Sequence, residues 1–419
     1  MILRAAYVLN LKFQPMPNWA VRVHKNGIVE VGPAKRIQGE TTTDLGDVLL
    51  IPGLVNAHAH LELGHLAGKV PPEGGLVDWL GRLLPRLRDV PPDAPEVAEA
   101  IEAGLAAALH SGTTLIGDIT RSPETSRAAI SSLARRPKVV SFGEVIALGT
   151  LRDRLAPALD AATAPPPEAV NLEIGISPHA PYTVEPEGLK ACAERARAAD
   201  LPLCIHAAES KEELQFTREG RGPLRDFLEA AGVWDERAPV PGCSPIELLE
   251  RCGVLGPRTL LAHCNYLSDT DMELIAKSRS SVVYCPRTHA AFGHPRHPVA
   301  ELQARKIRVC LGTDSLASNP SLSMLEELRF LRDVRPDIEP TALLDMATIE
   351  GTVAVEGLVL SRARPIGGIL GGGYRADLAA LAIPHGTTWK NAIEHALDEM
   401  RLMFVMQGGR VVRSLDGIG

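Results

Sequence analysis

The sequence predicts an α/β protein, a closed (β/α)8 TIM-like barrel with a small β-sandwich domain built from both termini. Three observations predict this fold. The middle of the chain alternates short apolar, strand-like runs with amphipathic helical stretches. Eight such strands occur, which is the number that closes a parallel barrel. Both ends of the chain show only short strands and turns, so we expect a composite β domain from residues 1–51 and 356–419 and a barrel from residues 52–355.

The terminal segments carry the signals of short strands joined by turns. Residues 20–23 and 28–31 alternate apolar and polar side chains around Lys25-Asn26-Gly27, which is typical of a β-hairpin. At the other end of the chain, residues 377–381, 403–406 and 409–412 are strand-like, and the last of these runs begins at a Gly-Gly turn. Because these two strand-rich ends flank a different middle, we expect them to assemble into one domain.

The middle of the chain supplies the barrel elements in order. The expected strands are residues 48–54, 114–118, 138–145, 172–177, 203–206, 259–263, 281–285 and 308–312. Helical stretches between them include residues 95–109, 186–199, 245–251, 269–276 and 322–332. No Gly-rich phosphate loop follows the first strand, which disfavours a doubly wound open sheet.

Composition excludes several classes of protein. The chain has 419 residues, of which 45% are hydrophobic and 23% charged, so it has the balance of an ordinary globular protein. Its net charge of −7 provides no basic field for nucleic acid or acidic lipid. The N-terminus lacks a signal peptide and no apolar run is long enough to cross a bilayer. We therefore expect a cytoplasmic protein with a small-molecule substrate, and leave open whether it forms a homo-oligomer.

Polar side chains gather at the ends of the expected barrel strands. His58 and His60 follow the apolar run 48–51, and side chains at positions i and i+2 share one face of a strand. Two neutral imidazoles that converge on one point are half of a first-row metal site. Later strand ends carry His206, His263 and Asp314, with Glu209 three residues after the first of these. Together these residues indicate a metal centre, although each one alone would more often be structural.

Five motifs around these residues resemble those of the amidohydrolase superfamily, namely PGLVNAHAH, SPHAPYT, HAAES, AHCNYL and LGTDS. The resemblance covers essentially the whole chain, including the split β domain. It implies that His58, His60, His206 and Asp314 ligate a metal ion. Binuclear members use a carbamylated Lys or a bridging acid on the fourth strand, and residues 172–179 contain no Lys. We therefore expect one divalent ion per chain, with zinc favoured and iron(II) also suited to three His and one Asp.

The resemblance also implies the catalytic roles. A divalent ion lowers the pKa of a water molecule toward neutrality. Asp314 would accept a proton from that water, and His263 would orient the water or polarise the leaving group. Glu209 would shuttle a proton to the ring nitrogen beside the attacked carbon, after which ammonia leaves. The His-x-x-Glu spacing of HAAES suits deamination, because peptide or ester hydrolysis would not need this second acid.

The substrate follows from a narrower resemblance, to the adenosine-type and chlorohydrolase-like deaminases. Residues 60–63, 77–80 and 284–290 resemble aminodeoxyfutalosine deaminases of the menaquinone pathway, whose substrate is an adenine nucleoside that carries a benzoate. Relatives that act on methylthioadenosine and S-adenosylhomocysteine carry a ribose-gripping Glu after a Trp-Leu…Leu-Pro stretch, and here that stretch continues as Arg86-Leu87-Arg88. The resemblance therefore implies deamination of aminodeoxyfutalosine at C6.

A buried benzoate requires a cation, so we expect an arginine near the outer pocket. The candidates are Arg86, Arg88, Arg225 and Arg287.

Four further residues are expected to bind substrate, each with a structural alternative. His179 in SPHAPYT would contact substrate unless it is a satisfied structural histidine. Glu144 would accept a hydrogen bond from the ribose or base unless it pairs with a barrel arginine. Glu62 would line the mouth of the site or cap the next helix, and Trp79 would stack on substrate or anchor a helix.

The sequence leaves other functions open. One is another reaction of the same metal site, on methylthioadenosine, S-adenosylhomocysteine, guanine, cytosine or a triazine. Another is a catalytically silent scaffold barrel, although this chain keeps every expected ligand and the shuttle acid. A histidine-rich segment after the seventh strand, with His289, His294 and His297, is expected to be an exposed loop rather than a second metal site. The seven cysteines lack framework spacing, so we expect buried, reduced thiols.

Overall fold

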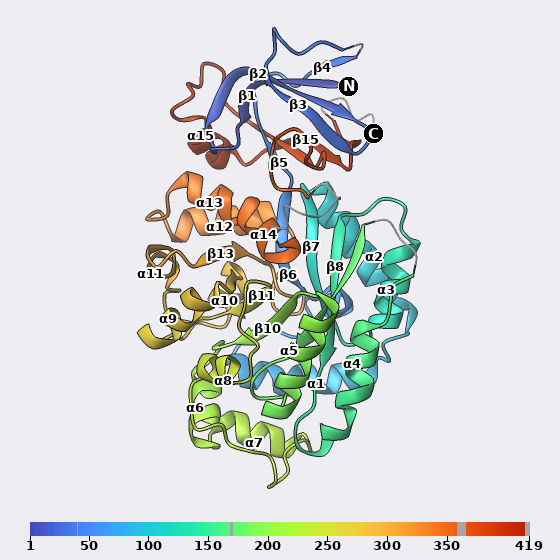
Figure 1. Ribbon diagram of the computed structural model, residues 1–419, viewed down its shortest axis with the longest axis vertical. Helices are drawn as coiled ribbons and strands as arrows, with labels where there is room; N and C mark the ends of the chain where they lie inside the picture. The colour runs from blue at the N-terminus through green and yellow to red at the C-terminus, as the bar shows by residue number, and fades with distance from the viewer. Residues whose placement is uncertain (40, 168–170, 358–365, 415–419) are drawn as a thin grey trace.

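The computed structural model describes residues 1–39, 41–167, 171–357 and 366–414 (Figure 1). Its larger part is an eight-stranded parallel sheet whose first and last strands meet. The sheet closes where the backbone amide of Asp314 donates to the carbonyl of His58 at 3.0 Å, and Ala59 bridges Asp314. The expected (β/α)8 barrel is therefore confirmed. Its strands are β6 (Leu54–Ala59), β7 (Thr113–Thr120), β8 (Lys138–Val145), β9 (Leu172–Pro178), β10 (Leu203–Ala207), β11 (Thr259–His263), β12 (Ser281–Tyr284) and β13 (Arg308–Leu311).

Helices surround this barrel, and many begin where the sequence supplies a helix-start signal. Proline opens several of them at a position where the missing N–H costs nothing, and Ser244 and Ser268 form capping boxes. The helices are α1 (Leu76–Asp89), α2 (Pro95–His110), α3 (Pro123–Ser132), α4 (Leu155–Thr163), α5 (Pro186–Ala199), α6 (Lys211–Glu219), α7 (Pro223–Ala230), α8 (Pro245–Arg251), α9 (Asp269–Ser278), α10 (Pro286–Ala291), α11 (Val299–Ala304), α12 (Met324–Val334), α13 (Pro340–Met346), α14 (Ile349–Glu356) and α15 (Ala392–Glu399), with 3-10 helices η1 (Leu61–Leu66) and η2 (Gly149–Arg154).

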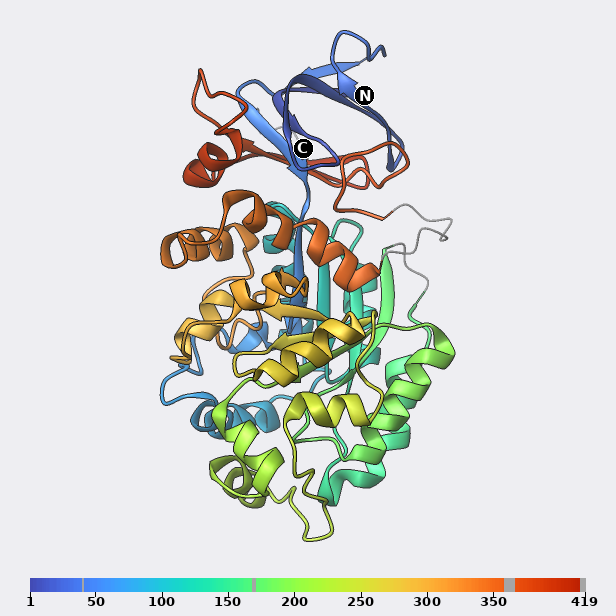
Figure 2. The ribbon, with the colours of Figure 1, turned by 60° about the vertical axis from the view of Figure 1, so that its left-hand side comes forward.

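The two ends of the chain pair in a second, mixed sheet, as expected. Strand β5 runs antiparallel to β14, with Ile51 opposite Ala379, and this pairing joins the N-terminal strands to the C-terminal ones. The hydrogen bonding is continuous through the whole sheet, which curls over on itself (Figure 2). The domain boundaries expected at residues 51/52 and 355/356 stay a prediction. The strands are β1 (Ile2–Leu9), β2 (Pro15–His24), β3 (Gly27–Pro33), β4 (Thr42–Asp44), β5 (Val48–Pro52), β14 (Leu378–Ala382), β15 (Leu402–Gln407) and β16 (Arg410–Arg413).

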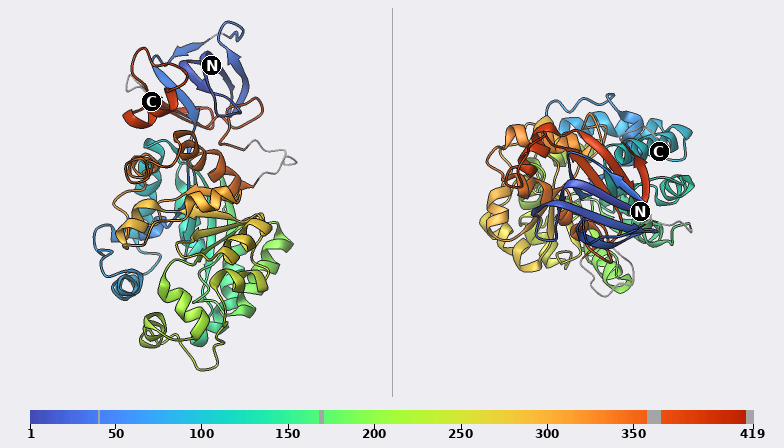
Figure 3. Two further views of the ribbon diagram at one scale, coloured as in Figure 1. Left: turned by 90° about the vertical axis from the view of Figure 1, so that its left-hand side faces the viewer. Right: turned by 90° about the horizontal axis from the view of Figure 1, so that it is seen from above.

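The terminal sheet and the helices α1 and α7 lie at opposite ends of the barrel (Figures 1 and 3). The chain passes from β5 in the terminal sheet directly into β6 of the barrel. The terminal sheet therefore faces the N-terminal ends of the barrel strands. Their C-terminal ends, where barrels of this kind carry their active sites, point toward α1 and α7.

One expected barrel strand is wrong in its bounds. Residues 48–54 were expected to form the first barrel strand, but β5 belongs to the terminal sheet and β6 begins only at Leu54. The break falls at Gly53, whose amide donates to the carbonyl of Asp377. A Cβ atom at this position would lie 2.2 Å from Oγ1 of Thr114, so glycine is required by the close approach. The apolar pattern runs on through Gly53 because both strands are buried, and it therefore did not reveal the change of sheet.

Two smaller expectations can be compared with the structure. All seven cysteines are buried and none is in a disulfide, which confirms reduced thiols in the core. Among the described residues, no helix combines the length and apolar character needed to span a bilayer.

Candidate active site

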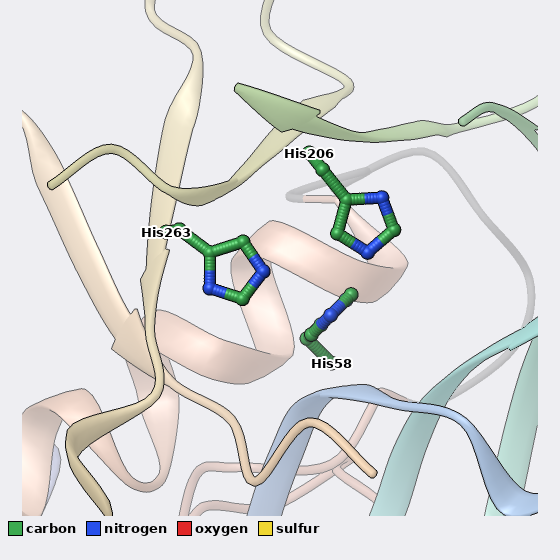
Figure 4. Close-up of side chains that lie close together, drawn as sticks. All are labelled: His58, His206 and His263. Atoms are coloured by element: carbon green, nitrogen blue, oxygen red, sulfur yellow. The ribbon is translucent and has the colours of Figure 1, made fainter. Parts of the chain in front are cut away.

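Four of the expected metal ligands converge inside the barrel at the C-terminal ends of its strands. His58 lies in β6, His60 directly after it, His206 in β10, and Asp314 three residues after the end of β13. The Nε2 atoms of His58 and His60 each lie 3.6 Å from Oδ1 of Asp314. The Nε2 atoms of His60 and His206 are 3.2 Å apart. Figure 4 shows the rings of His58, His206 and His263 turned toward a common centre.

The donor set fits a divalent metal. Nδ1 of His206 lies 2.8 Å from the carbonyl oxygen of His179 and donates to it, which leaves the Nε2 lone pair facing His60. Nε2 of His58 is buried without a hydrogen-bond partner among the described residues. Two nitrogens bound tetrahedrally at the usual zinc distance lie about 3.3 Å apart, close to the separation of His60 and His206. A divalent metal therefore satisfies atoms that the protein alone leaves unpaired.

Burial keeps the imidazoles of His60 and His206 in the neutral form that binds metals. It lowers the pKa of His60 to about 3, helped by the neighbouring His58. Burial and the neighbouring His179 lower the pKa of His206 well below its usual value. Burial alone would raise the pKa of Asp314, but His58, His60 and a 2.8 Å hydrogen bond from Ser318 outweigh it and lower that pKa. The site thus offers neutral nitrogens and a carboxylate, as divalent ions of this class require.

The backbone is strained at three of the strand ends that form this site. Ala208, His263 and Asp314 have positive φ angles of 50°, 73° and 60°, although none is glycine. Such conformations are maintained only where the surroundings fix them, and they concentrate at functional sites.

Glu209 and His263 lie beside the ligand cluster, with Oε1 of Glu209 3.6 Å from Nε2 of His263. Burial, followed by the charges of Asp314 and Glu213, raises the pKa of Glu209 well above its usual value. A protonated carboxylic acid beside the metal position is the state that a proton donor requires. The His263 ring is also close enough to His58 and His206 to join the ligand set, so its expected role as a non-ligand stays a prediction.

The turn that carries Glu209 is held by Glu213, a residue that the sequence analysis missed. The buried Glu213 carboxylate accepts hydrogen bonds from the backbone amides of Ala208 and Glu209 at 3.0 and 2.7 Å. The Asn265 side-chain amide donates to the carbonyl of Glu209 at 3.0 Å. A second acid four residues after Glu209, in the first turn of a helix, was the available signal in the sequence.

A cavity of about 220 Å³ opens from the metal cluster toward α1 and α7. All four residues expected to bind substrate line it: Glu62, Trp79, Glu144 and His179. Burial, followed by the charge of Glu62, raises the pKa of Glu144 to about 8. Nε2 of His179 lies 3.9 Å from Oε1 of Glu144, and Nδ1 of His179 lies 2.8 Å from the Thr183 hydroxyl. These two side chains therefore form a polar wall next to the metal cluster.

Glu62 and Trp79 have protein partners as well as a place in the lining. Glu62 binds Arg121 at 2.7 Å and accepts from Thr120 at 3.0 Å, so its carboxylate is largely satisfied. The Trp79 indole donates to the carbonyls of Val70 and Ala317, and its ring packs edge-on against Phe292. Trp79 therefore anchors α1 while one face remains in the cavity wall. Substrate binding by all four residues stays a prediction.

The outer part of the cavity is apolar. Its lining from α1, α7 and their neighbours comprises Leu76, Leu80, Leu83, Leu84, Leu87, Leu151, Phe227, Leu228 and Val233. Helices α1 and α7 pack together here, with Leu80 against the cluster that contains Leu224 and Leu228. A binding site for an apolar group of substantial size is therefore present at this end.

Of the four arginines expected near the outer pocket, Arg88 lies at the rim of the cavity and none is among its described lining residues. Their binding to substrate stays a prediction. Arg225 stacks on Trp234 and pairs with Glu229 and Glu236, while Arg287 binds Ser321. Arg86 and Arg88 are exposed, but Arg88 reaches the rim, where it donates to the carbonyl of the lining residue Ala231 at 3.3 Å. Among the described lining residues, the cation is instead Arg121, which the sequence analysis did not consider.

The histidine-rich segment 289–297 is not the exposed loop that was expected. His289 and His297 are buried, and the His297 ring stacks on Tyr284 at 4.0 Å. Nε2 of His297 lies 2.8 Å from the carbonyl oxygen of His263. In the described part of the chain, none of these histidines belongs to a group of side chains whose ligand atoms lie close enough together to hold a metal ion. This segment therefore packs behind His263 as structural support.

Comparison with known proteins places the chain among metal-dependent hydrolases. It is 30% identical over 429 residues to a 5-methylthioadenosine/S-adenosylhomocysteine deaminase of Nitratidesulfovibrio vulgaris, covering 94% of this chain and 89% of the relative. It is 29% identical over 324 residues to an aminodeoxyfutalosine deaminase of Deinococcus radiodurans, covering 74% of each chain.

Solved structures share the fold over the whole chain. An aminofutalosine deaminase of Helicobacter pylori in complex with methylthio-coformycin has a TM-score of 0.83 at 21% identity, covering 98% of this chain and 99% of that one. An adenosine deaminase of Xanthomonas campestris with bound zinc has a TM-score of 0.79 at 22% identity, covering 100% of this chain and 94% of that one. The model of the Amidohydrolase family matches residues 49–412, and the chain belongs to this family.

Proposed function

We propose that this protein is a metal-dependent hydrolytic deaminase of a 6-aminopurine nucleoside with an aryl-bearing 5′ extension, and that aminodeoxyfutalosine is its substrate. The observation that carries the proposal is the continuity of one cavity from the His/Asp cluster to the leucine-lined wall of α1 and α7. The curated relatives are named as deaminases of adenosine-like nucleosides, which supports the reaction class. They differ in substrate, so the choice of substrate rests on the cavity.

In the proposed reaction, His58, His60, His206 and Asp314 would hold the metal, and zinc is the preferred ion. When bound, this ion would supply a water molecule whose pKa is lowered toward neutrality. Asp314 would accept a proton from the water as its oxygen bonds to C6, and the buried, protonated Glu209 would donate its proton to the ring nitrogen next to C6. Asp314 would then pass its proton to the amino group, the C6–N bond would break with loss of ammonia, and the C6 hydroxyl would return a proton to Glu209. His263, which faces both Glu209 and the ligand cluster, would stabilise the charge that develops at C6.

The polar and apolar parts of the cavity match the parts of such a substrate. Glu144 and His179 lie beside the ligand cluster, where they can form hydrogen bonds with the base and the ribose hydroxyls. The leucines of α1 then face the 5′ extension. A methylthio group would fill little of this wall, whereas an aryl ring would bury apolar surface along it, at about 25 cal/mol per Å².

The carboxylate of the benzoate is proposed to lie at the rim, next to Arg88. Arg121 is less suitable, because its guanidinium is already paired with Glu62 inside the cavity. Arg88 is exposed and donates to a backbone carbonyl at the rim, so it can turn toward an incoming carboxylate.

A second candidate substrate is methylthioadenosine. The outer lining is uniformly apolar, and the charge of Arg121 is neutralised by Glu62. Neither feature provides a partner for a substrate carboxylate inside the cavity, and both therefore favour methylthioadenosine.

Ammonia release from aminodeoxyfutalosine, methylthioadenosine and adenosine separates these candidates. We expect kcat/KM to be highest for aminodeoxyfutalosine, by about tenfold or more over methylthioadenosine. Arg88→Met should remove this advantage, while Arg86→Met, on the same exposed helix turn but without the rim contact, should keep it. A preference for methylthioadenosine, or equal effects of both variants, would reject the proposed substrate. No ammonia from any nucleoside would reject the deaminase itself.

A further inference from the structure

A second cavity lies between the barrel and the terminal sheet, at the opposite end of the barrel from the candidate active site. It encloses about 320 Å³. Residues 133–136, just before β8, and Asn171, just before β9, form its barrel side. Gln407, Gly408 and residues 410–412, from the end of β15 to β16, form its other side together with Asn26 and Arg375. The cavity thus sits at the N-terminal ends of the barrel strands. The terminal sheet faces these strand ends (Figure 1).

The lining of this cavity is strongly basic. It contains four arginines from three separate stretches of chain, namely Arg135, Arg136, Arg375 and Arg410. No aspartate or glutamate occurs among its described lining residues. Arg135 and Arg410 are exposed and make no ion pair with any part of the chain that the structure describes. The charges of Arg135 and Arg410 are therefore not compensated by an acidic group in the described part of the chain, so this side of the cavity attracts an anion.

Two buried donors in the lining are left without acceptors. Arg375 is only 5% exposed, and its Nε and Nη1 atoms bind Asp377 and Glu356, but its Nη2 has no hydrogen-bond partner among the residues that the structure describes. The Gln407 side-chain Nε2 is also inaccessible and unpartnered within the described residues. Buried donors are nearly always satisfied, so two of them in one basic cavity indicate an acceptor that the chain does not supply.

The barrel side of the cavity is rigid enough to hold a ligand. The buried Arg136 guanidinium donates to the carbonyls of Ile130 and Asn171 at 2.7 and 2.8 Å, which fixes its position at the cavity wall. Arg375 is fixed in turn through Glu356, which also binds Lys138 at 2.8 Å. Two guanidinium groups are therefore preorganised, while the two exposed arginines are free to close over a ligand.

We propose that this cavity binds a small phosphorylated molecule with more than one negative charge. The planar guanidinium fork matches the oxygens of phosphate, and the two separate charges of Arg135 and Arg410, together with the unsatisfied Arg375 Nη2 and Gln407 Nε2 donors, suit a diphosphate better than a single phosphate. The site is independent of the deaminase activity proposed above, since it lies at the other end of the barrel and shares no lining residue with that cavity.

Titration calorimetry of the metal-loaded, full-length protein tests the site, with sodium pyrophosphate as the ligand and inorganic phosphate and citrate as comparisons. We expect one saturable site per chain at about 0.15 M salt, with pyrophosphate bound more tightly than phosphate or citrate. The R135A/R410A variant should weaken pyrophosphate binding by about tenfold or more. The R401A/R413A variant is the matched control, because it removes two exposed arginines outside the cavity, one just before β15 and one in β16, and it should bind like the wild type.

Several results would overturn the proposal. These are the absence of saturable binding, equal binding by the two double variants, or tighter binding of citrate than of pyrophosphate. Pyrophosphate is also a chelator, so the titration is repeated with Asp314→Asn. If pyrophosphate binding survives in R135A/R410A but disappears in Asp314→Asn, pyrophosphate binds at the metal centre, and the proposed site is rejected. The Gln407→Leu variant gives a second reading, with weaker pyrophosphate binding and an unchanged Tm expected.

Discussion

The two ends of the active-site cavity are built from different parts of the fold. The inner end is polar and comes from the barrel strands, whose C-terminal ends carry the His/Asp cluster. The outer end is apolar and comes from α1, η2 and α7, which lie outside the barrel sheet. The chemistry of the inner end can thus be retained while the outer helices change, as is general for barrels of this kind.

This difference implies two kinds of mutational effect. A change at the inner end should lower activity on every substrate alike, because it alters the reacting groups. A change at the outer end should alter the ratio of kcat/KM between substrates, because under the proposed function it touches only the 5′ extension. Substitutions at the two ends test this division between chemistry and substrate preference.

Loss of the metal should have the largest effect. We expect chelation, or the His206→Ala substitution, to abolish ammonia release from all nucleosides, because the water then keeps its ordinary pKa. Elemental analysis should find one ion per chain in the wild type. Two ions per chain at full activity would contradict the mononuclear site, and activity without any ion would contradict the metal centre altogether.

Glu209→Gln should lower kcat by roughly 10²–10⁴-fold for every substrate, the usual contribution of a general acid or base. The metal content should not change, because Glu209 is not among the proposed ligands. Glu212→Gln is the control, since this neighbouring glutamate lies outside the cavity lining. Turnover of the Glu209 variant within about threefold of the wild type would show that another group shuttles the proton.

The inner end was predictable from the sequence and the outer end was not. His58, His60 and Asp314 stand in short motifs directly at strand ends, and the fold brings such positions together whatever the loops do. The leucines of α1 have no comparable signal, because an apolar helix face predicts burial without saying against what. Arg121 lies after β7 in a segment without a motif, so only the structure shows that it enters the cavity.

The sequence also did not reveal where one strand ends and the next begins, or which distant residues support the active site. The change of sheet at Gly53 is hidden because β5 and β6 are both fully buried and equally apolar. His297 was expected in an exposed loop after the seventh strand. Its burial depends on contacts with Tyr284 and with the carbonyl of His263, which precede it by 13 and 34 residues.

Leu84→Asp should alter substrate preference at the outer end. A carboxylate in the leucine wall should lower kcat/KM for substrates with an apolar 5′ extension by about 10–200-fold, while adenosine should be affected much less. Arg86→Asp on the exposed face of the same helix is the control. An equal loss for adenosine and the extended nucleosides would mean that the outer wall also positions the reacting groups, and the division between the two ends would fail.

His297 should give the smallest effect. It lines neither end of the active-site cavity, yet it supports the inner end. Its ring donates to the carbonyl of His263, a residue held at a strained φ of 73°. His297→Phe keeps the stacking on Tyr284 but removes the donor. A hydrogen bond of this kind contributes about 0.5–1.5 kcal/mol, so we expect kcat to fall by about 2- to 12-fold. His297→Gln, which restores a donor, should recover part of this loss.

The measurement that distinguishes positioning from specificity is the ratio of kcat/KM between aminodeoxyfutalosine and adenosine. If His297 acts only through His263, this ratio stays at the wild-type value in His297→Phe, although both rates fall, because His263 faces the reacting end of every substrate. A change in the ratio would show that the segment behind His263 also reads the 5′ extension. The inner end would then carry specificity as well as chemistry, contrary to the separation that the two parts of the fold suggest.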